Sequence, residues 1–276
     1  MADERARASA AGATPGAGRP SGGDTSSSAA SRGHPDKRRP SFFWALALLV
    51  PPFIRIAAKV RVLHPERLPA TGAFILAPNH HSNVDPLLIA TVVWRLGRAP
   101  RFLAKASLFK LPVVGWLFRS SGQIPVERGG VQRGAIPLDA AKRVVQEGHC
   151  VVVYPEGSLT RDPHLWPMRG KTGAARLALQ LGIPVIPAAH WGTQDVMPRY
   201  SKRIRLLPRA RVDVLIGEPV DLSAWQGRTD GVALQEATAA IMSAITALLE
   251  QLRGQAAPTE RWDPTQHGQA ETGRFT

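Results

Sequence analysis

The stretch AFILAPNHHSNVDPLLIA, residues 73–90, decides the fold because it places a polar, titratable segment between two apolar runs. The apolar residues of its first part predict a buried strand. Ser82 and Asn83 are residue types that form tight turns. Asp85 followed by Pro86 is a favoured helix start, with the acid at the N-cap and proline at the first helical position. We therefore predict a strand, a turn and a helix in this order.

The same alternation of short and long apolar patterns continues from Val60 to Leu252. Segments typical of strands are RVLH, AFILAP, RFLAK, GQIPV, CVVVYP, IPVIPAA and RVDVLIG. Segments with helical periodicity are 86–96, 134–147, 171–181 and 232–252. This alternation favours an α/β fold with a largely parallel mixed sheet flanked by helices. Ligands of such folds bind beyond the carboxyl ends of strands, which is where Asn79 and His80 are expected.

The composition indicates a basic globular protein with an anionic partner. The 276 residues include 35 Lys and Arg against 21 Asp and Glu, for a formal net charge of +14, and 44% are hydrophobic. Anionic lipid or a phosphorylated ligand would suit this charge. Aromatic residues make up only 6%, and no basic stretch is interleaved with stacking side chains, so we expect no nucleic-acid partner. Cys150 is the single cysteine, which excludes an internal disulfide.

The chain divides into four predicted regions. Residues 1–36 are rich in Ala, Gly, Ser and Pro, and we expect them to be a disordered tail. Residues 37–59 form an apolar segment with basic flanks, and residues 60–253 carry the α/β pattern. Residues 254–276 have no apolar periodicity and are predicted to be a second disordered tail.

Residues 37–59 are predicted to be a membrane-associating helical segment. Their apolar part runs only from Phe42 to Ile54, whereas a spanning helix needs about 20 apolar residues. Pro51 and Pro52 would also interrupt the helix. Basic residues flank this part on both sides, as in segments that lie at an anionic headgroup surface. They are Lys37, Arg38, Arg39, Arg55, Lys59 and Arg61. The alternative is an ordinary amphipathic helix that caps the core.

His80 and Asp85 are candidate catalytic residues, although each has a simpler explanation as a loop residue or a helix cap. On one continuous helix, residues five positions apart point about 140° away from each other, so a contact requires a turn between strand and helix. A carboxylate beside the imidazole would fix the ring tautomer and stabilise the protonated ring, as a general base requires. No G-x-S-x-G sequence occurs, so a serine hydrolase is unsupported. We expect no metal site from His80, His81 and Asp85, because further ligands are missing beside them.

The segment NHHSNVD, residues 79–85, resembles the N-H-x-S-x-x-D motif of the glycerolipid acyltransferases. The resemblance implies that His80 deprotonates an acceptor hydroxyl, which then attacks an acyl thioester, and that Asp85 orients the histidine. His81 occupies the variable position of the motif and receives no role.

Three later segments resemble further blocks of this family, in the family's order. SGQIPVERG implies that Arg128 engages the acceptor phosphate, and GIPVIPAA implies an acyl pocket at Pro184 and Pro187. VVVYPEGSLTRD implies further phosphate-binding residues, namely Glu156, Gly157 and Ser158.

The third block departs from the family pattern at one position. Leu159 stands where the family commonly has arginine, which leaves the acceptor open. Arg161 and Lys171 are nearby cations that are able to bind a phosphate instead.

The resemblance implies an O-acyltransferase that uses acyl-CoA or acyl carrier protein as thioester co-substrate and needs no cofactor. The expected reaction transfers a fatty acyl chain to 1-acylglycerol 3-phosphate, which gives phosphatidic acid for phospholipid biosynthesis. The expected place is the cytoplasmic face of the cell membrane, on an anionic surface. Two alternatives stay open: another acceptor, such as glycerol 3-phosphate or another lysophospholipid, and a non-catalytic peripheral protein that binds anionic lipid.

Overall fold

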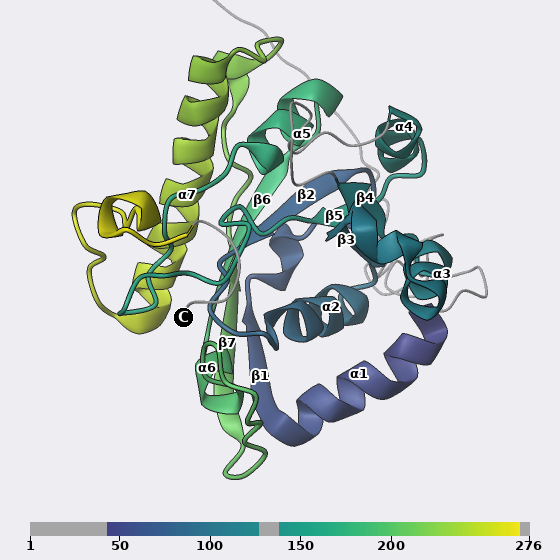
Figure 1. Cartoon of the computed structure of the whole chain (residues 1–276), viewed down its shortest axis with the longest axis vertical. Helices are drawn as coiled ribbons and strands as arrows, with labels where there is room; N and C mark the ends of the chain where they lie inside the picture. The colour runs from purple at the N-terminus through teal and green to yellow at the C-terminus, as the bar shows by residue number, and fades with distance from the viewer. Residues whose placement is uncertain (1–42, 127–137, 271–276) are drawn as a thin grey trace, which may run out of the picture. The chain divides into compact units, whose positions relative to one another are not determined.

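The predicted strands assemble into one mixed sheet in the computed structural model, which describes residues 43–126 and 138–270 (Figure 1). The strands are β1 Ala58–Leu63, β2 Phe74–Pro78, β3 Pro100–Lys105, β4 Ile124–Val126, β5 Cys150–Val152, β6 Val185–Trp191 and β7 Ala210–Ile216. Their order across the sheet is β1-β7-β6-β2-β5-β3-β4. Neighbours are parallel except β6 and β7, which confirms the largely parallel α/β fold.

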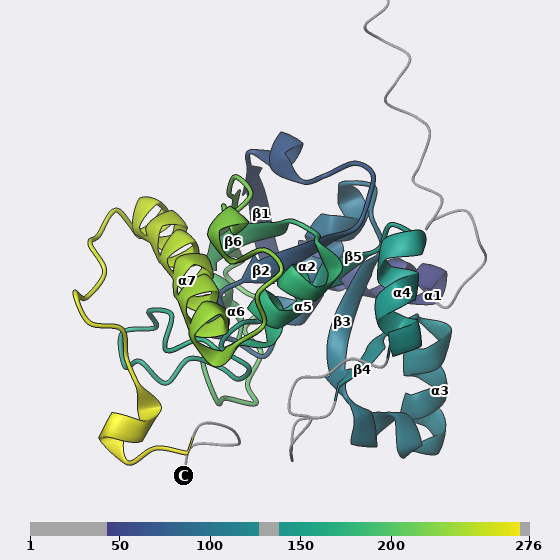
Figure 2. The same ribbon diagram turned by 90° about the horizontal axis from the view of Figure 1, so that it is seen from above.

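The helices follow the predicted periodicity, with two additions that the sequence did not indicate, α3 and α6. The bounds are α1 Phe43–Ala57, α2 Asp85–Arg95, α3 Pro112–Ser120, α4 Leu138–Gln146, α5 Gly173–Leu181, α6 Thr193–Val196 and α7 Gly231–Arg253. Short 3-10 helices lie at Pro65–Arg67, Ala106–Lys110, Ser223–Trp225 and Pro264–His267. Seen from above, α3 and α4 lie beside β3 and β4, away from α7 (Figure 2).

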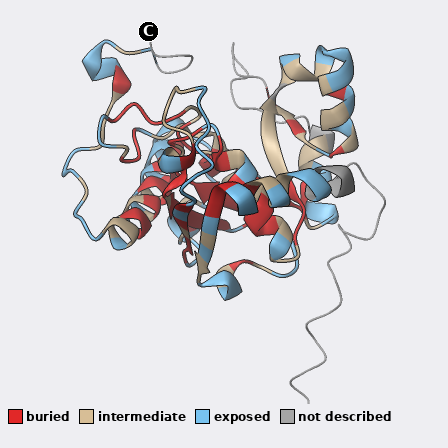
Figure 3. Ribbon diagram, turned by 90° about the horizontal axis from the view of Figure 1, so that it is seen from below, coloured by how far each residue is buried: buried red, intermediate tan, exposed pale blue. Residues whose placement is uncertain are grey.

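The sheet has a hydrophobic core on each face, because successive strand residues point to opposite sides. In β2, Phe74 and Leu76 pack with α1 and α2, whereas Ile75 and Ala77 pack with α5 and α7. All four side chains are buried, and buried residues gather on the central strands (Figure 3). The carboxyl end of β2 therefore emerges from the middle of a rigid three-layer structure.

The predicted interruption at Pro51 and Pro52 is wrong, because α1 continues through both prolines to Ala57. The two missing N–H groups cost hydrogen bonds within the helix. Burial of Ile54 and Ala57 in the core shared with α2 offsets this loss. Tertiary packing thus overrides the local helix-breaking signal.

The predicted disorder from Gly254 onward is wrong for the described part of that tail. Asp263 caps the 3-10 helix Pro264–His267 by accepting a hydrogen bond from the Thr265 N–H at 2.9 Å. Trp262 stacks on His267 with 3.5 Å between ring centroids, and its carbonyl accepts from the Arg169 N–H at 2.8 Å. Such caps and long-range bonds leave no periodic signal in the sequence.

The helix α7 is long and apolar enough to cross a membrane, and among the described residues it alone meets both criteria. It packs on β6, β7 and α5, and half of its apolar window is buried inside the protein. Its apolar stripe, which includes Ile241 and Ile245, belongs to the core. Packing therefore accounts for its hydropathy.

Replacing Arg98 should strongly destabilise the fold. Arg98 is 1% exposed, and its guanidinium donates to the carbonyl oxygens of Pro69, Gly72 and Gly148 at 2.6, 2.8 and 2.5 Å. Arg98→Met would leave these buried acceptors unpaired, so we expect a loss of about 3 kcal/mol or more in the free energy of unfolding, measured in urea. Exposed Arg95→Met is the control, and equal effects of both variants would contradict this account.

Candidate active site

The polar side chains of the site lie just after three neighbouring strands. β2, β5 and β6 are parallel to one another, so their carboxyl ends meet at the same edge of the sheet. His80 follows β2, Tyr154 and Glu156 follow β5, and Thr193 follows β6. Residues far apart in the chain are thereby brought together.

A single carboxylate oxygen organises the turn between β2 and α2. Asp85 is fully buried, and its Oδ2 accepts from the backbone N–H groups of His81 and Ser82, both at 2.8 Å. The same oxygen lies 3.0 Å from Nδ1 of His80. The helix begins at Asp85 with Val84 at the N-cap, so the predicted N-cap position of Asp85 is wrong by one residue. The side chain reaches back to the turn instead of capping its own helix.

The contact with Asp85 determines the tautomer of His80. A carboxylate only accepts hydrogen bonds, so Nδ1 carries the proton and Nε2 of the neutral ring keeps a free lone pair. The ring stacks on Tyr154 with 4.1 Å between centroids, and the side chain is 15% exposed. The predicted pair of His80 and Asp85 is therefore assembled, with one ring nitrogen available to a proton.

The surroundings of Asp85 favour its ionised form. Burial on its own would raise the pKa of Asp85, whereas His190, His81 and His80 lower it, and the net pKa lies below the ordinary range. The two backbone N–H groups that bond Oδ2 act in the same direction. Asp85 is thus a carboxylate that stabilises a positive charge on His80.

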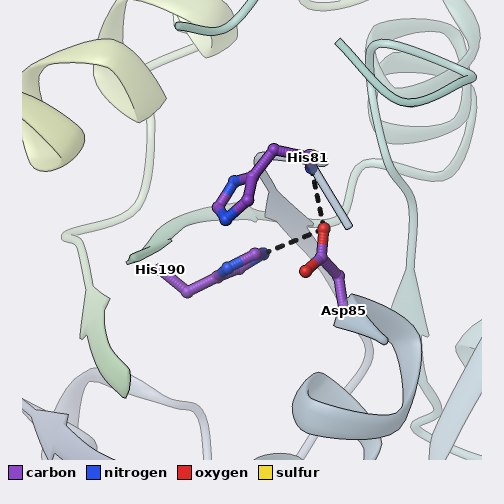
Figure 4. A group of neighbouring side chains, drawn as sticks. All are labelled: His81, Asp85 and His190. Carbon is purple, nitrogen blue, oxygen red and sulfur yellow. Dashed lines mark hydrogen bonds and ion pairs between the residues drawn. The ribbon is translucent and has the colours of Figure 1, made fainter. Parts of the chain in front are cut away.

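His81 and His190 lie next to Asp85 (Figure 4), and both belong to a closed ring of buried hydrogen bonds with Asn79 and Thr193. The Asn79 side-chain oxygen accepts from the His190 backbone N–H at 2.9 Å, so its amide nitrogen is the donor to His81 Nδ1 at 3.0 Å. His81 Nε2–H then donates to the Thr193 hydroxyl at 2.8 Å, and that hydroxyl donates to His190 Nδ1 at 3.5 Å. His190 Nε2–H returns to the Asn79 carbonyl at 3.0 Å, with Asp85 Oδ2 at 3.7 Å.

Both histidines of this ring are neutral, and both ring nitrogens of each have a hydrogen-bond partner. Burial lowers the pKa of His81 to about 3, and it also lowers the pKa of His190. Potential ligand atoms of His81, Asp85 and His190 lie within 4.8 Å of one another, which makes them the candidate metal ligands. However, Asn79 and Thr193 already use both ring nitrogens of each histidine as donors or acceptors, so the geometry fits a positioning network better than a metal site.

Glu156 connects the third sequence block to the turn between β2 and α2. It is fully buried, and its two oxygens accept from the backbone N–H groups of His80 at 2.9 Å and Met168 at 3.0 Å. This place does not favour the predicted phosphate-binding role, because the carboxyl group faces the interior and both of its oxygens already accept from backbone N–H groups. Glu156 instead holds the backbone of His80 against the loop that follows β5.

A cavity of about 420 Å³ opens beside His80 and Tyr154. Apolar side chains from α1, α2, α3 and β3 form most of its wall, among them Val50, Leu87, Phe102 and Phe118. Its size and lining suit an apolar chain whose reactive end lies at the histidine.

The remaining members of the third motif lie close to one another. Gly157 has φ +70°, which favours glycine, and a Cβ there would lie 2.9 Å from Cδ of Lys171. Lys171 therefore covers Gly157, and its N–H bonds the Pro155 carbonyl at 2.8 Å. The Gly157 N–H donates to the Tyr154 carbonyl at 3.0 Å and is not available to a substrate oxygen.

Other predicted site residues are less accessible or lie elsewhere. Ser158 is half-buried beside Gly157, whereas Arg161 is buried at 4% exposure, so a substrate reaches Lys171 more easily than Arg161. Leu159 is also buried, which explains an apolar residue at that position. Arg128 lies outside the described residues.

The two prolines of the predicted acyl pocket lie away from the cavity beside His80, and Pro184 lines a separate cavity of about 470 Å³. Pro184 is exposed and precedes β6, at the end of the strand opposite to His80. Pro187 is buried within β6, paired in register with Ala77. Neither proline lines the cavity beside His80.

Several site residues had no assigned role in the sequence analysis: Asn79, Tyr154, His190 and Thr193. Each follows or ends a predicted strand, and this position is the sequence feature that could have identified them as site residues. Which strands are neighbours, however, depends on the sheet order, and the linear sequence does not contain it.

Comparison with known proteins identifies the class that this fold and site define. Residues 59–191 match the family model described as Acyltransferase. The matched region runs from β1 to the end of β6 and includes His80, Asp85 and Glu156. Residues 59–191 therefore form a domain of the acyltransferase family, as the resemblance in the sequence implied.

Particular relatives share one name. The protein from Brassica napus named 1-acyl-sn-glycerol-3-phosphate acyltransferase BAT2, chloroplastic, is 31% identical over 156 residues, which cover 56% of this chain and 43% of that protein. The 1-acyl-sn-glycerol-3-phosphate acyltransferase of Bacillus subtilis is 27% identical over 178 residues, 64% of this chain and 81% of that protein. The chain spans less than half the length of the Brassica napus and Arabidopsis thaliana relatives.

A solved structure has the same fold. It is the 1-acyl-sn-glycerophosphate (LPA) acyltransferase PlsC from Thermotoga maritima, with a TM-score of 0.53 and 23% sequence identity. The match covers 81% of this chain and 87% of that one. The α/β sheet with flanking helices is therefore an architecture that acyltransferases use.

Glu156 should make stability depend on pH. Burial raises its pKa to about 8 from an ordinary 4.5, so the folded protein keeps a proton that the unfolded chain releases in this interval. The free energy of unfolding should therefore fall as the pH rises from about 4.5 to about 8, by up to about 1.4 kcal/mol per pH unit from this group. Urea unfolding across this range should show a flatter dependence for Glu156→Gln, which cannot ionise. Identical slopes would contradict the assignment.

The hydrogen-bond ring predicts different effects for two substitutions of Thr193. Thr193→Val keeps the shape but leaves His81 Nε2–H and His190 Nδ1 without a partner, so we expect a loss of about 1–3 kcal/mol in the free energy of unfolding. Thr193→Ser keeps the hydroxyl and should cost about 0.8 kcal/mol, the value of one buried methyl group. Thermal and urea unfolding measure both, and equal losses would show that the hydroxyl is unimportant.

Proposed function

We propose that the protein transfers a fatty acyl chain from a thioester, acyl-CoA or acyl carrier protein, to the hydroxyl of 1-acylglycerol 3-phosphate, which gives phosphatidic acid. The observation that carries this proposal is the contact of His80 with Asp85 beside an apolar cavity of about 420 Å³. The names of the relatives from Brassica napus and Bacillus subtilis support the acceptor. The reaction belongs to phospholipid biosynthesis.

In the proposed mechanism His80 is the general base. The acceptor hydroxyl gives its proton to Nε2 while its oxygen attacks the thioester carbonyl carbon. Asp85, a buried carboxylate 3.0 Å from Nδ1, stabilises the imidazolium that forms. The tetrahedral intermediate then breaks its C–S bond, and the leaving thiolate takes the proton from Nε2. The products are an ester and a free thiol, and His80 returns to its neutral form.

The two ends of the substrates would lie in different surroundings. The acyl chain suits the apolar cavity, whose wall includes Leu87 and Phe118. The acceptor phosphate needs a cation, and Lys171 beside Gly157 supplies one at the loop that Glu156 ties to His80. Arg128 is the second proposed phosphate ligand, on the basis of its motif.

The enzyme would act at a membrane, where its acceptor and product are located. α1 carries exposed apolar residues, Leu48, Leu49 and Ile56, and it also supplies Val50 and Pro51 to the wall of the cavity. A helix that rests on the bilayer would thus bring the cavity close to the lipid. We propose the cytoplasmic face of the cell membrane, where acyl thioesters are available.

Replacing His80 should abolish acyl transfer. We expect His80→Ala to lower the rate of acceptor-dependent CoA release at least about a hundredfold, because general-base catalysis contributes on this scale. The assay uses oleoyl-CoA and 1-acylglycerol 3-phosphate in mixed micelles, with thiol release as the readout. The control is His64→Ala, since His64 is exposed and pairs only with Glu66 in the described structure. A folded His80→Ala variant with near-normal release would refute the role of His80.

The acceptor is tested with the same assay. Glycerol 3-phosphate and larger lysophospholipids replace 1-acylglycerol 3-phosphate in turn, because Leu159 departs from the family pattern. Preference for one of these would reassign the acceptor but keep the chemistry of His80. No thiol release with any acceptor or carrier would favour the non-catalytic lipid-binding protein.

A further inference from the structure

The loop between α6 and β7 exposes apolar side chains among cations. Ile204, Leu206 and Leu207 are 49%, 40% and 81% exposed within four consecutive positions. No acidic residue occurs between Asp195 and Asp213. The cations of this interval are Arg199, Lys202, Arg203, Arg205, Arg209 and Arg211. Single exposed apolar residues are common on protein surfaces, but a group of three within a basic segment indicates an interaction surface.

Hydrogen bonds hold the base of this loop, so the exposed tip is presented on a fixed support. The Arg199 guanidinium donates to the carbonyl oxygens of Thr160 and Asp162 at 2.8 and 2.6 Å. The Arg205 N–H bonds the Val196 carbonyl at 2.8 Å. The apolar tip is therefore exposed in the folded loop itself. This exposure costs free energy in water, and binding to an apolar partner would recover that free energy.

The loop is joined to the carboxyl end of α1, and both lie at the lower edge of the molecule in Figure 1. The Arg209 guanidinium donates to the carbonyl oxygens of Arg55 and Ala58, the latter at 3.1 Å. Beside this contact is a cavity of about 230 Å³, here named the basic recess. Its wall includes four exposed cations, Arg55, Lys59, Arg95 and Arg209.

The cations of the basic recess have no acidic partner within the described part of the chain. No ion pair involves Arg55, Lys59, Arg95 or Arg209, and the Arg209 guanidinium bonds only to carbonyl oxygens there. Four neighbouring positive charges without a counter-charge repel one another, and a bound anion would relieve this repulsion. A phosphate group matches both guanidinium and ammonium donors.

We propose that the loop tip, residues 204–207, and the basic recess dock together on an anionic lipid bilayer. The aliphatic side chains of the tip enter the interface, and the recess takes the phosphate group of a lipid headgroup. Residues 201–209 contain no aromatic side chain, which makes a nucleic-acid surface a poorer match. Because Arg55 and the cavity residues Val50 and Pro51 lie on the same helix, docking would fix the cavity at the membrane; this consequence rests on the proposed function.

Vesicle sedimentation of the full chain tests the proposal without any substrate. We expect binding to phosphatidylcholine vesicles that contain phosphatidylglycerol, and little binding to pure phosphatidylcholine. Lys202→Gln/Arg203→Gln should weaken binding about tenfold or more, since each basic residue near the surface contributes measurably. Leu206→Ser/Leu207→Ser should weaken it to a similar degree, and Lys59→Gln/Arg95→Gln should reduce the preference for anionic vesicles.

The chain offers a matched control in α4, another exposed Lys-Arg pair far from the loop in Figure 1. Lys142→Gln/Arg143→Gln removes the same charges and should leave vesicle binding unchanged. All variants should retain thiol release with micellar substrate. Loss of vesicle binding by a variant that keeps normal thiol release in micelles therefore supports the docking surface. Absence of thiol release in micelles, for the wild type as well, would contradict only the proposed function.

Several results would overturn the proposal. Equal loss in the α4 control would indicate that net charge alone governs binding. Full binding by Leu206→Ser/Leu207→Ser would exclude insertion of the loop tip. Inorganic phosphate that binds the recess without competing with vesicles would make it a site for free phosphate. Duplex DNA that displaces the protein from vesicles at physiological salt would assign the surface to nucleic acid.

Discussion

One carboxylate oxygen, Oδ2 of Asp85, holds together the strand, the turn and the helix on which the site depends. It accepts hydrogen bonds from the N–H groups of His81 and Ser82 and lies 3.0 Å from His80 Nδ1. A buried carboxylate is costly unless such donors surround it. The bonds that compensate for its burial also set the tautomer of His80. The same carboxylate oxygen therefore closes the turn and fixes which ring nitrogen of His80 carries the proton.

Directed hydrogen bonds hold the histidines next to this oxygen, although Oδ1 of Asp85 itself has no hydrogen-bond partner in the described structure. Neutral His81 and His190 form a directed hydrogen-bond ring with Asn79 and Thr193. Glu156 binds the backbone of His80 from the loop that follows the neighbouring strand β5. A buried ring in which each donor has an acceptor favours one arrangement of its side chains. His80 also lines the apolar cavity, so one side chain links the polar residues around Asp85 to the apolar wall.

Most elements follow from local pattern, and the failures have identifiable causes. The seven predicted strands are all present, and the polar turn between β2 and α2 contains the predicted pair. The helix α1 passes through Pro51 and Pro52 because its packing offsets the lost hydrogen bonds. The segment up to residue 270 is ordered by caps and by contacts with distant residues, which composition does not reveal. Glu156, which was predicted to lie at a phosphate, is buried and accepts from the backbone N–H groups of His80 and Met168, a place that the sequence did not reveal.

Periodicity and turn chemistry are properties of neighbouring residues, and for that reason the sequence alone determined the strands, the main helices and the motif that places His80 near Asp85. The tertiary structure decided which strands are adjacent. The order β6-β2-β5 brings Thr193 and Glu156 to the same edge as His80, and helix packing forms the cavity. Contacts between residues about a hundred positions apart depend on sheet order and on burial, and both arise only when the whole chain packs around a common core.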